Sequence, residues 1–122
     1  MSHQGATADL LKVARTSLRE RVMPQVEAEA RYEAAMVANA MAIAIRELEI
    51  GPQARAEERA LLGIFLGQPD ATLPQLRRRL CRELRSPPFA EKHAIELRTL
   101  LERLVHARLA ISNPAYPATV QP

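Results

Sequence analysis

The chain has 122 residues, of which 48% are hydrophobic and 25% are charged. This length is sufficient to bury a core without crosslinks, and the composition is that of a folded globular domain rather than a disordered chain. The single cysteine, Cys81, excludes an intramolecular disulfide and fits a reducing compartment. No apolar run approaches the ~20 residues of a membrane span, and the N-terminus lacks the basic-then-apolar order of a signal peptide. We therefore expect a cytoplasmic protein.

The first predicted helix covers residues 8–22, where apolar side chains recur at helical spacing. Thr7 precedes it and is expected to be its N-cap, because a threonine oxygen accepts a hydrogen bond from a free backbone N–H of the first turn. Met23-Pro24 interrupts the pattern, since proline disfavours the helical conformation of the residue before it.

Residues 25–50, QVEAEARYEAAMVANAMAIAIRELEI, predict one long central helix. Between Ala34 and Ile45 it is apolar on every face, which is typical of a buried helix. Its alanines allow neighbouring helices to approach closely, as in the middle of a bundle. Gly51-Pro52 is expected to end this helix, with the glycine just past it and the proline opening the next one.

Three further helices are predicted after the central one. One runs to about Leu66 and is followed by a turn at residues 67–70. The next begins at a capping box formed by Thr72 and Gln75 and carries a narrow leucine stripe. The last extends from about residue 89 to Ile111, with leucines at heptad spacing.

These patterns predict an all-α protein, since no stretch alternates strictly over the length of a strand. The expected architecture is a single-domain bundle of about five helices around the buried central helix. The bundle domain is expected to cover residues 1–111, and residues 112–122 form a proline-rich tail that begins near Asn113-Pro114.

Three polar residues, Tyr32, Asn39 and Arg46, recur every seven residues on the central helix, each about 20° from the last. Buried polar groups cost free energy unless they are hydrogen-bonded, so these residues need partners. One interpretation is a structural network that fixes helix register or a dimer. The other is an inter-helix pocket in which they bind a small ligand.

Arginines dominate the fourth predicted helix. Residues 72–85 contain five arginines and one glutamate, a net charge of +4, whereas the remainder of the chain has a net charge of −1. The arginines are Arg77, Arg78, Arg79, Arg82 and Arg85. They predict a site for phosphate, an acidic partner or nucleic acid, and the alternative is a solvated face in a chain that uses 15 arginines and only 2 lysines. Nucleic acid is disfavoured because only two Tyr, two Phe and no Trp are available for base stacking.

No recognisable catalytic, metal or cofactor signature accompanies these features. The four glycines are scattered, and no Glu-x-x-His pair occurs. Cys81 lies beside the leucine stripe of the fourth helix, which predicts a buried structural thiol rather than a nucleophile. We therefore expect no cofactor and no metal, and an enzymatic role is disfavoured.

Four segments together resemble a known family: LLKVARTSLRERVMP, RYEAAMVANAMAIAIRELEIGP, LCRELR and RLAISNPAY. The family comprises small bacterial helical proteins classed as a domain of unknown function, and the likeness covers nearly the whole chain in the same order. Its most recognisable positions are Arg31, Ala38, Asn39, Arg46, Glu47, Leu48, Asn113-Pro114 and Tyr116. Glu33 stands where members often carry a histidine, which argues against an essential histidine there.

Members of this family tend to be encoded beside aminoglycoside-kinase-type phosphotransferases and acyl-CoA dehydrogenases. The resemblance therefore implies an accessory role near such enzymes, and it supplies no catalytic residue. The expected function is a non-enzymatic interaction protein of a phosphotransferase or an acyl-CoA-handling enzyme. The alternative is a binder of a phosphorylated or acyl-CoA metabolite in an inter-helix pocket. A homodimer that completes the bundle is a further expectation.

Overall fold

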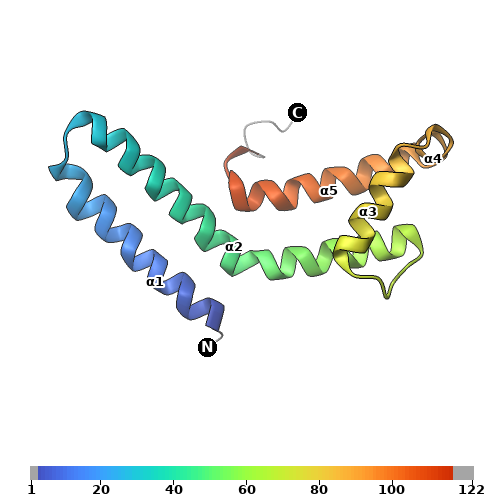
Figure 1. The fold of residues 1–122 in the computed structure, drawn as a ribbon, viewed down its shortest axis with the longest axis horizontal. Helices are drawn as coiled ribbons and strands as arrows, with labels where there is room; N and C mark the ends of the chain where they lie inside the picture. Colours follow the sequence, from blue (N-terminus) through green and yellow to red (C-terminus); the bar gives the residue numbers. More distant parts are fainter. Residues whose placement is uncertain (1–2, 117–122) are drawn as a thin grey trace. The chain divides into compact units, whose positions relative to one another are not determined.

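The computed structural model describes residues 3–116 and confirms the all-α class, with five α-helices and no strand in that range (Figure 1). The helices are α1 (His3–Ser17), α2 (Ala28–Leu66), α3 (Leu73–Leu84), α4 (Pro87–Lys92) and α5 (Ala94–Ser112). The described residues divide into two compact units. Residues 3–52 with 111–114 form unit 1, and residues 53–110 with 115–116 form unit 2. The tail predicted for residues 112–122 extends beyond the described residues.

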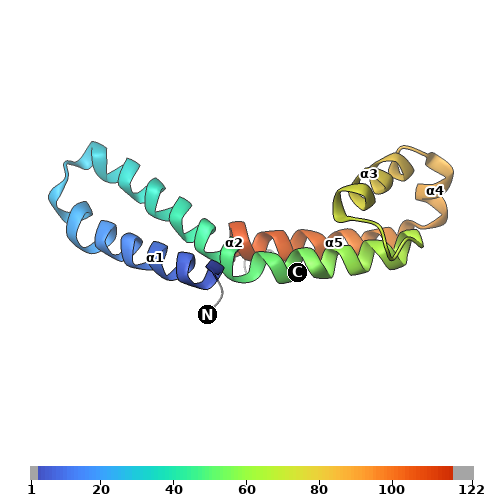
Figure 2. The same cartoon turned by 60° about the horizontal axis from the view of Figure 1, so that its bottom comes forward.

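Unit 1 is built on a hairpin in which α1 lies antiparallel to the first half of α2 (Figures 1 and 2). The chain reverses through a π-helical turn, Leu18–Val22, and a 3-10 turn, Met23–Gln25. Arg15 Nε donates a hydrogen bond to the carbonyl of Ala38 at 2.9 Å, and Lys12 pairs with Glu49 at 3.1 Å. Polar contacts from long side chains therefore tie the two helices together.

The start of α1 differs from the prediction. The helix begins at His3 rather than at residue 8, and Thr7 Oγ1 donates to the carbonyl of His3 at 3.0 Å. A threonine inside a helix makes this bond to the carbonyl four residues earlier, so Thr7 is an interior residue and not an N-cap.

Helix α2 does not end at Gly51-Pro52, so that prediction is wrong. It continues for 39 residues with Pro52 in its interior. A helix that ends at a glycine usually places that glycine at positive φ, whereas Gly67 is the only residue with positive φ among residues 3–116. Gly51 is instead buried within the helix, and the helical packing on both sides of Pro52 overrides the local break signal.

The true end of α2 lies at Gly67, where φ is +68°. The N–H of Gln68 donates to the carbonyl of Gly63 at 2.9 Å, and the N–H of Gly67 donates to the carbonyl of Ile64 at 3.3 Å. These two hydrogen bonds make a Schellman motif. A Cβ added to Gly63 would lie 3.2 Å from Cα of Pro69, so this glycine allows the turn to fold back closely. The turn predicted at residues 67–70 is confirmed.

The predicted capping box at the start of α3 is also confirmed. The N–H of Gln75 donates to Thr72 Oγ1 at 3.3 Å, and the N–H of Thr72 donates to Gln75 Oε1 at 2.9 Å. The last predicted helix, in contrast, is divided into α4 and α5 at His93, whose backbone leaves the helical conformation.

Unit 2 encloses a leucine core contributed by α2, α3 and α5. Its buried members are Leu62, Leu76, Leu80, Leu97 and Leu100. The rings of Phe65, Phe89 and His93 contact one another with centroids 4.6 to 5.9 Å apart, and Phe65 meets the other two edge to face. The leucine stripe predicted on α3 therefore does face a core.

The central helix is much less buried than predicted. Between Ala28 and Pro52 the buried residues are Ala38, Ile45 and Gly51, whereas Met36 and Val37 are 56% and 53% exposed. In unit 1, α1 packs against α2, and part of the apolar surface of α2, including Met36 and Val37, stays exposed.

Truncation of Leu62, which is fully buried, should lower the free energy of unfolding by about 2 to 5 kcal/mol because Leu62→Ala opens a cavity in the core. Ile64→Ala is the matched control, since Ile64 lies two residues away on the same helix and is 79% exposed, and it should change stability by less than about 0.5 kcal/mol. Urea denaturation followed by circular dichroism measures both, and equal losses would contradict the described core.

Candidate functional site

The three polar residues predicted on the central helix, Tyr32, Asn39 and Arg46, lie on the part of α2 that belongs to unit 1. Tyr32 is 71% exposed, and Asn39 is also exposed, so the expected burial of Asn39 is wrong. Arg46 is half-buried, and its Nε donates to the carbonyl of Ile111 at 2.6 Å. The last carbonyls of a helix have no intrahelical partner, so Arg46 caps the C-terminal end of α5.

Apolar residues of α2 lie between the polar residues Tyr32 and Asn39 and directly after them on the same side of the helix. Tyr32, Met36, Asn39 and Ile43 are spaced by four, three and four residues, which is the spacing of a coiled-coil seam. We call these four residues the α2 seam. Tyr32, Met36 and Asn39 are exposed and Ile43 is half-buried.

Two of the five predicted arginines on α3 are neutralised within the fold. Arg77 forms a bidentate ion pair with Glu58, with Nε–Oε2 at 2.6 Å and Nη2–Oε1 at 3.0 Å. The hydrogen bonds to Glu58 raise the pKa of Arg77 against the opposing effect of burial. Glu58 is only 8% exposed, so this pair satisfies a buried carboxylate. Arg79 pairs with Glu83 at 3.3 Å.

The other three arginines, Arg78, Arg82 and Arg85, have no ion-pair partner within residues 3–116, and we call them the Arg stripe. Together with Arg77, Gln75 and Cys81 they line a hollow of about 590 Å³. Cys81 is exposed, so the predicted burial of its thiol is wrong. Successive residues of a helix differ by 100°, which turns Cys81 away from the core even though its neighbour Leu80 is buried.

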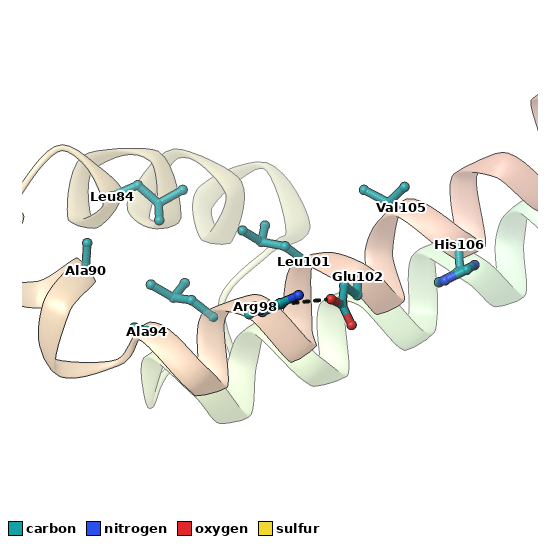
Figure 3. Close-up of a pocket in the computed structure, with 9 residues that line it drawn as sticks. Leu84, Ala90, Ala94, Arg98, Leu101, Glu102, Val105 and His106 are labelled. Atoms are coloured by element: carbon teal, nitrogen blue, oxygen red, sulfur yellow. Dashed lines mark hydrogen bonds and ion pairs between the residues drawn. The ribbon is translucent and has the colours of Figure 1, made fainter. Parts of the chain in front are cut away.

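A second hollow, of about 510 Å³, lies on α5 and is predominantly apolar (Figure 3). Leu84 of α3 and Leu101 and Val105 of α5 contribute to it, and all three are partly exposed. At its rim Arg98 pairs with Glu102 at 3.1 Å, and His106 lies one turn further along α5. Glu102 therefore has Arg98 as its ion-pair partner rather than His106.

Within residues 3–116, no group of three or more His, Cys, Asp or Glu side chains is placed to hold a metal ion. Every helix within residues 3–116 is too short or too polar to cross a lipid bilayer.

Comparison with known families gives one match. The model of the family described as Domain of unknown function (DUF6285) matches residues 24–116. The chain belongs to this family. No curated protein and no solved structure matches it.

The DUF6285 match includes the α2 seam, the Arg stripe and all helices from α2 to α5. Helix α1 lies before the matched residues, although it packs against α2 in unit 1. The resemblance noted in the sequence to a domain of unknown function is thus confirmed.

Removal of Arg77 should leave the buried carboxylate of Glu58 without its bidentate partner. We expect Arg77→Ala to lower the free energy of unfolding by about 1 to 3 kcal/mol, towards the lower end because the Arg77 side chain is 44% exposed and water reaches the pair. Arg98→Ala is the control, because the side chains of Arg98 and Glu102 are 82% and 60% exposed, and it should cost less than about 0.5 kcal/mol. Urea denaturation compares them, and equal losses would show that the Arg77–Glu58 pair is not structural.

Proposed function

We propose that the protein is a non-enzymatic interaction module that binds a phosphotransferase or an acyl-CoA-handling enzyme. The observation that carries this proposal is the apolar surface of the unit 1 hairpin. Leu10 and Val13 of α1 are 70% and 66% exposed, and Met36 and Val37 of α2 are more than half exposed. Large exposed apolar patches mark interaction sites, because a partner that covers them removes apolar area from water at about 25 cal/mol per Å².

The residue types of the α2 seam favour a protein partner. Tyrosine and methionine are enriched at interfaces, where tyrosine combines a large apolar ring with a polar tip. An asparagine at a seam position favours one register over others at some cost in affinity. Residues 3–52 carry six basic and seven acidic residues, so burial of apolar area rather than net charge should dominate binding to this unit.

The choice of partner rests on the family resemblance. That resemblance implies gene neighbours that encode aminoglycoside-kinase-type phosphotransferases and acyl-CoA dehydrogenases, and neighbouring genes often encode proteins that act together. An accessory subunit needs no catalytic residue of its own, which agrees with a surface built from apolar side chains.

A second copy of the chain is the competing occupant of the same surface. A homodimer would bury the α2 seam and the apolar face of α1 in a symmetric helical bundle. Light scattering of the purified protein separates the two possibilities, since a homodimer has twice the monomer mass in the absence of any other protein.

The alternative function, a binder of a phosphorylated or acyl-CoA metabolite between helices, has less support from the geometry. Such a pocket needs Tyr32 and Asn39 to be enclosed, and both side chains are open to solvent. The Arg stripe is the feature of the fold that favours an anionic ligand.

Co-purification tests the proposal. We expect the tagged protein to retain a coexpressed phosphotransferase or acyl-CoA dehydrogenase encoded beside it. Met36→Glu should weaken this complex at least about tenfold, because it places a charge in the centre of the apolar surface. Ile95→Glu is the matched control, since Ile95 is 84% exposed and lies on α5 in unit 2.

The proposal is wrong if the wild-type proteins migrate separately at micromolar concentration and neither changes the activity of the other. Equal weakening by Met36→Glu and Ile95→Glu would instead show that binding does not use the unit 1 hairpin.

A further inference from the structure

We propose that the Arg stripe is a binding site for a diphosphate or triphosphate group. The site lies on α3 in unit 2, and the inference does not depend on the partner proposed above. It rests on the positions, the charge and the surroundings of Arg78, Arg82 and Arg85.

The three guanidinium groups arise from one face of α3. Their spacing of four and three residues places them within roughly 60° of the helix circumference and over about 10 Å along the axis. Arginine side chains are long enough to converge from these positions on neighbouring phosphoryl groups. A linear polyphosphate presents successive sets of oxygens along such a row, and each set accepts bidentate hydrogen bonds from a guanidinium group.

The charge of the stripe is not compensated within the described fold. Nearby glutamates neutralise Arg77 and Arg79, whereas Arg78, Arg82 and Arg85 have no acidic partner among residues 3–116. Three like charges on adjacent turns repel one another, and a bound anion relieves this repulsion. A diphosphate group carries a charge of about −3 near neutral pH, which matches the three positive charges of the stripe.

The hollow beside the stripe gives a ligand room to approach. The hollow measures about 590 Å³, and its lining includes the short Cys81 side chain and Gln75 besides the arginines. Arg77 forms part of the lining and is held in place by its two hydrogen bonds to Glu58. One fixed guanidinium beside three unpaired ones favours a compact anion with several oxygens over a single carboxylate.

Bases of a nucleic acid strand would find no aromatic stacking partner among the side chains of this hollow. The observations therefore favour a small polyphosphate over a nucleic acid, and the experiment below separates these ligands.

Cys81 provides a reporter within the site, because it is the only cysteine and is exposed in the hollow. The rate of Cys81 alkylation by iodoacetamide, a neutral reagent, is measured with increasing inorganic pyrophosphate or ADP. Sodium chloride at the same ionic strength is the control. We expect pyrophosphate or ADP to slow alkylation at least about threefold and to saturate, because a bound phosphate group covers the thiol, while chloride has no such effect.

Two double variants test whether the protection of Cys81 depends on the Arg stripe. Arg78→Gln with Arg82→Gln should lose the protection by pyrophosphate. Arg98→Gln with Arg103→Gln removes the same charge from surface ion pairs of the same unit and should keep the protection. Circular dichroism verifies that both variants are folded, and a stripe variant that fails to fold is replaced by Arg85→Gln alone, which should weaken protection.

Tighter binding of ADP than of pyrophosphate would identify a nucleotide as the ligand, and equal binding would identify a bare polyphosphate. Either result supports the site. The inference is overturned if chloride slows alkylation as much as pyrophosphate does, if the stripe variant keeps full protection, or if polyglutamate or single-stranded DNA protects Cys81 and pyrophosphate does not.

Discussion

The continuity of α2 through Gly51 and Pro52 is the constraint on which both units depend. The same helix contributes Ala38 and Ile45 to unit 1 and Leu62 to the core of unit 2. A proline in a helix interior removes one hydrogen bond and crowds the carbonyl four residues earlier, at a cost of about 3 kcal/mol. Packing within each unit must offset this cost.

The parts of the fold that local rules determine could be predicted from the sequence. The capping box of Thr72 and Gln75 depends on two side chains and two N–H groups within one turn, and the residues themselves encode it. The signal at Gly51-Pro52 is equally local but has two outcomes, since a proline can open a helix or be tolerated inside one. Tertiary packing decides between them, and packing is not visible in a single sequence.

In the candidate sites too, local features could be predicted from the sequence, whereas tertiary contacts could not. The excess of arginine on α3 was evident from the sequence, but the pairing of Arg77 with Glu58, 19 residues away, was not. That pair, together with the Arg79–Glu83 pair, separates the neutralised arginines from the Arg stripe. The prediction that the central helix is buried failed for a different reason. An apolar helix face predicts burial, and the sequence does not reveal whether the covering surface belongs to the same chain or to a partner.

Hydrogen exchange at the amides of Gln53 and Ala54, measured by NMR, tests the continuity of α2 most directly. In a continuous helix these N–H groups donate to the carbonyls of Glu49 and Ile50. In a helix that restarts at Pro52 they belong to the first turn and have no intrahelical acceptor. The structure predicts that both exchange at least about tenfold more slowly than in an unstructured chain. Exchange at the rate of an unstructured chain would contradict a continuous α2.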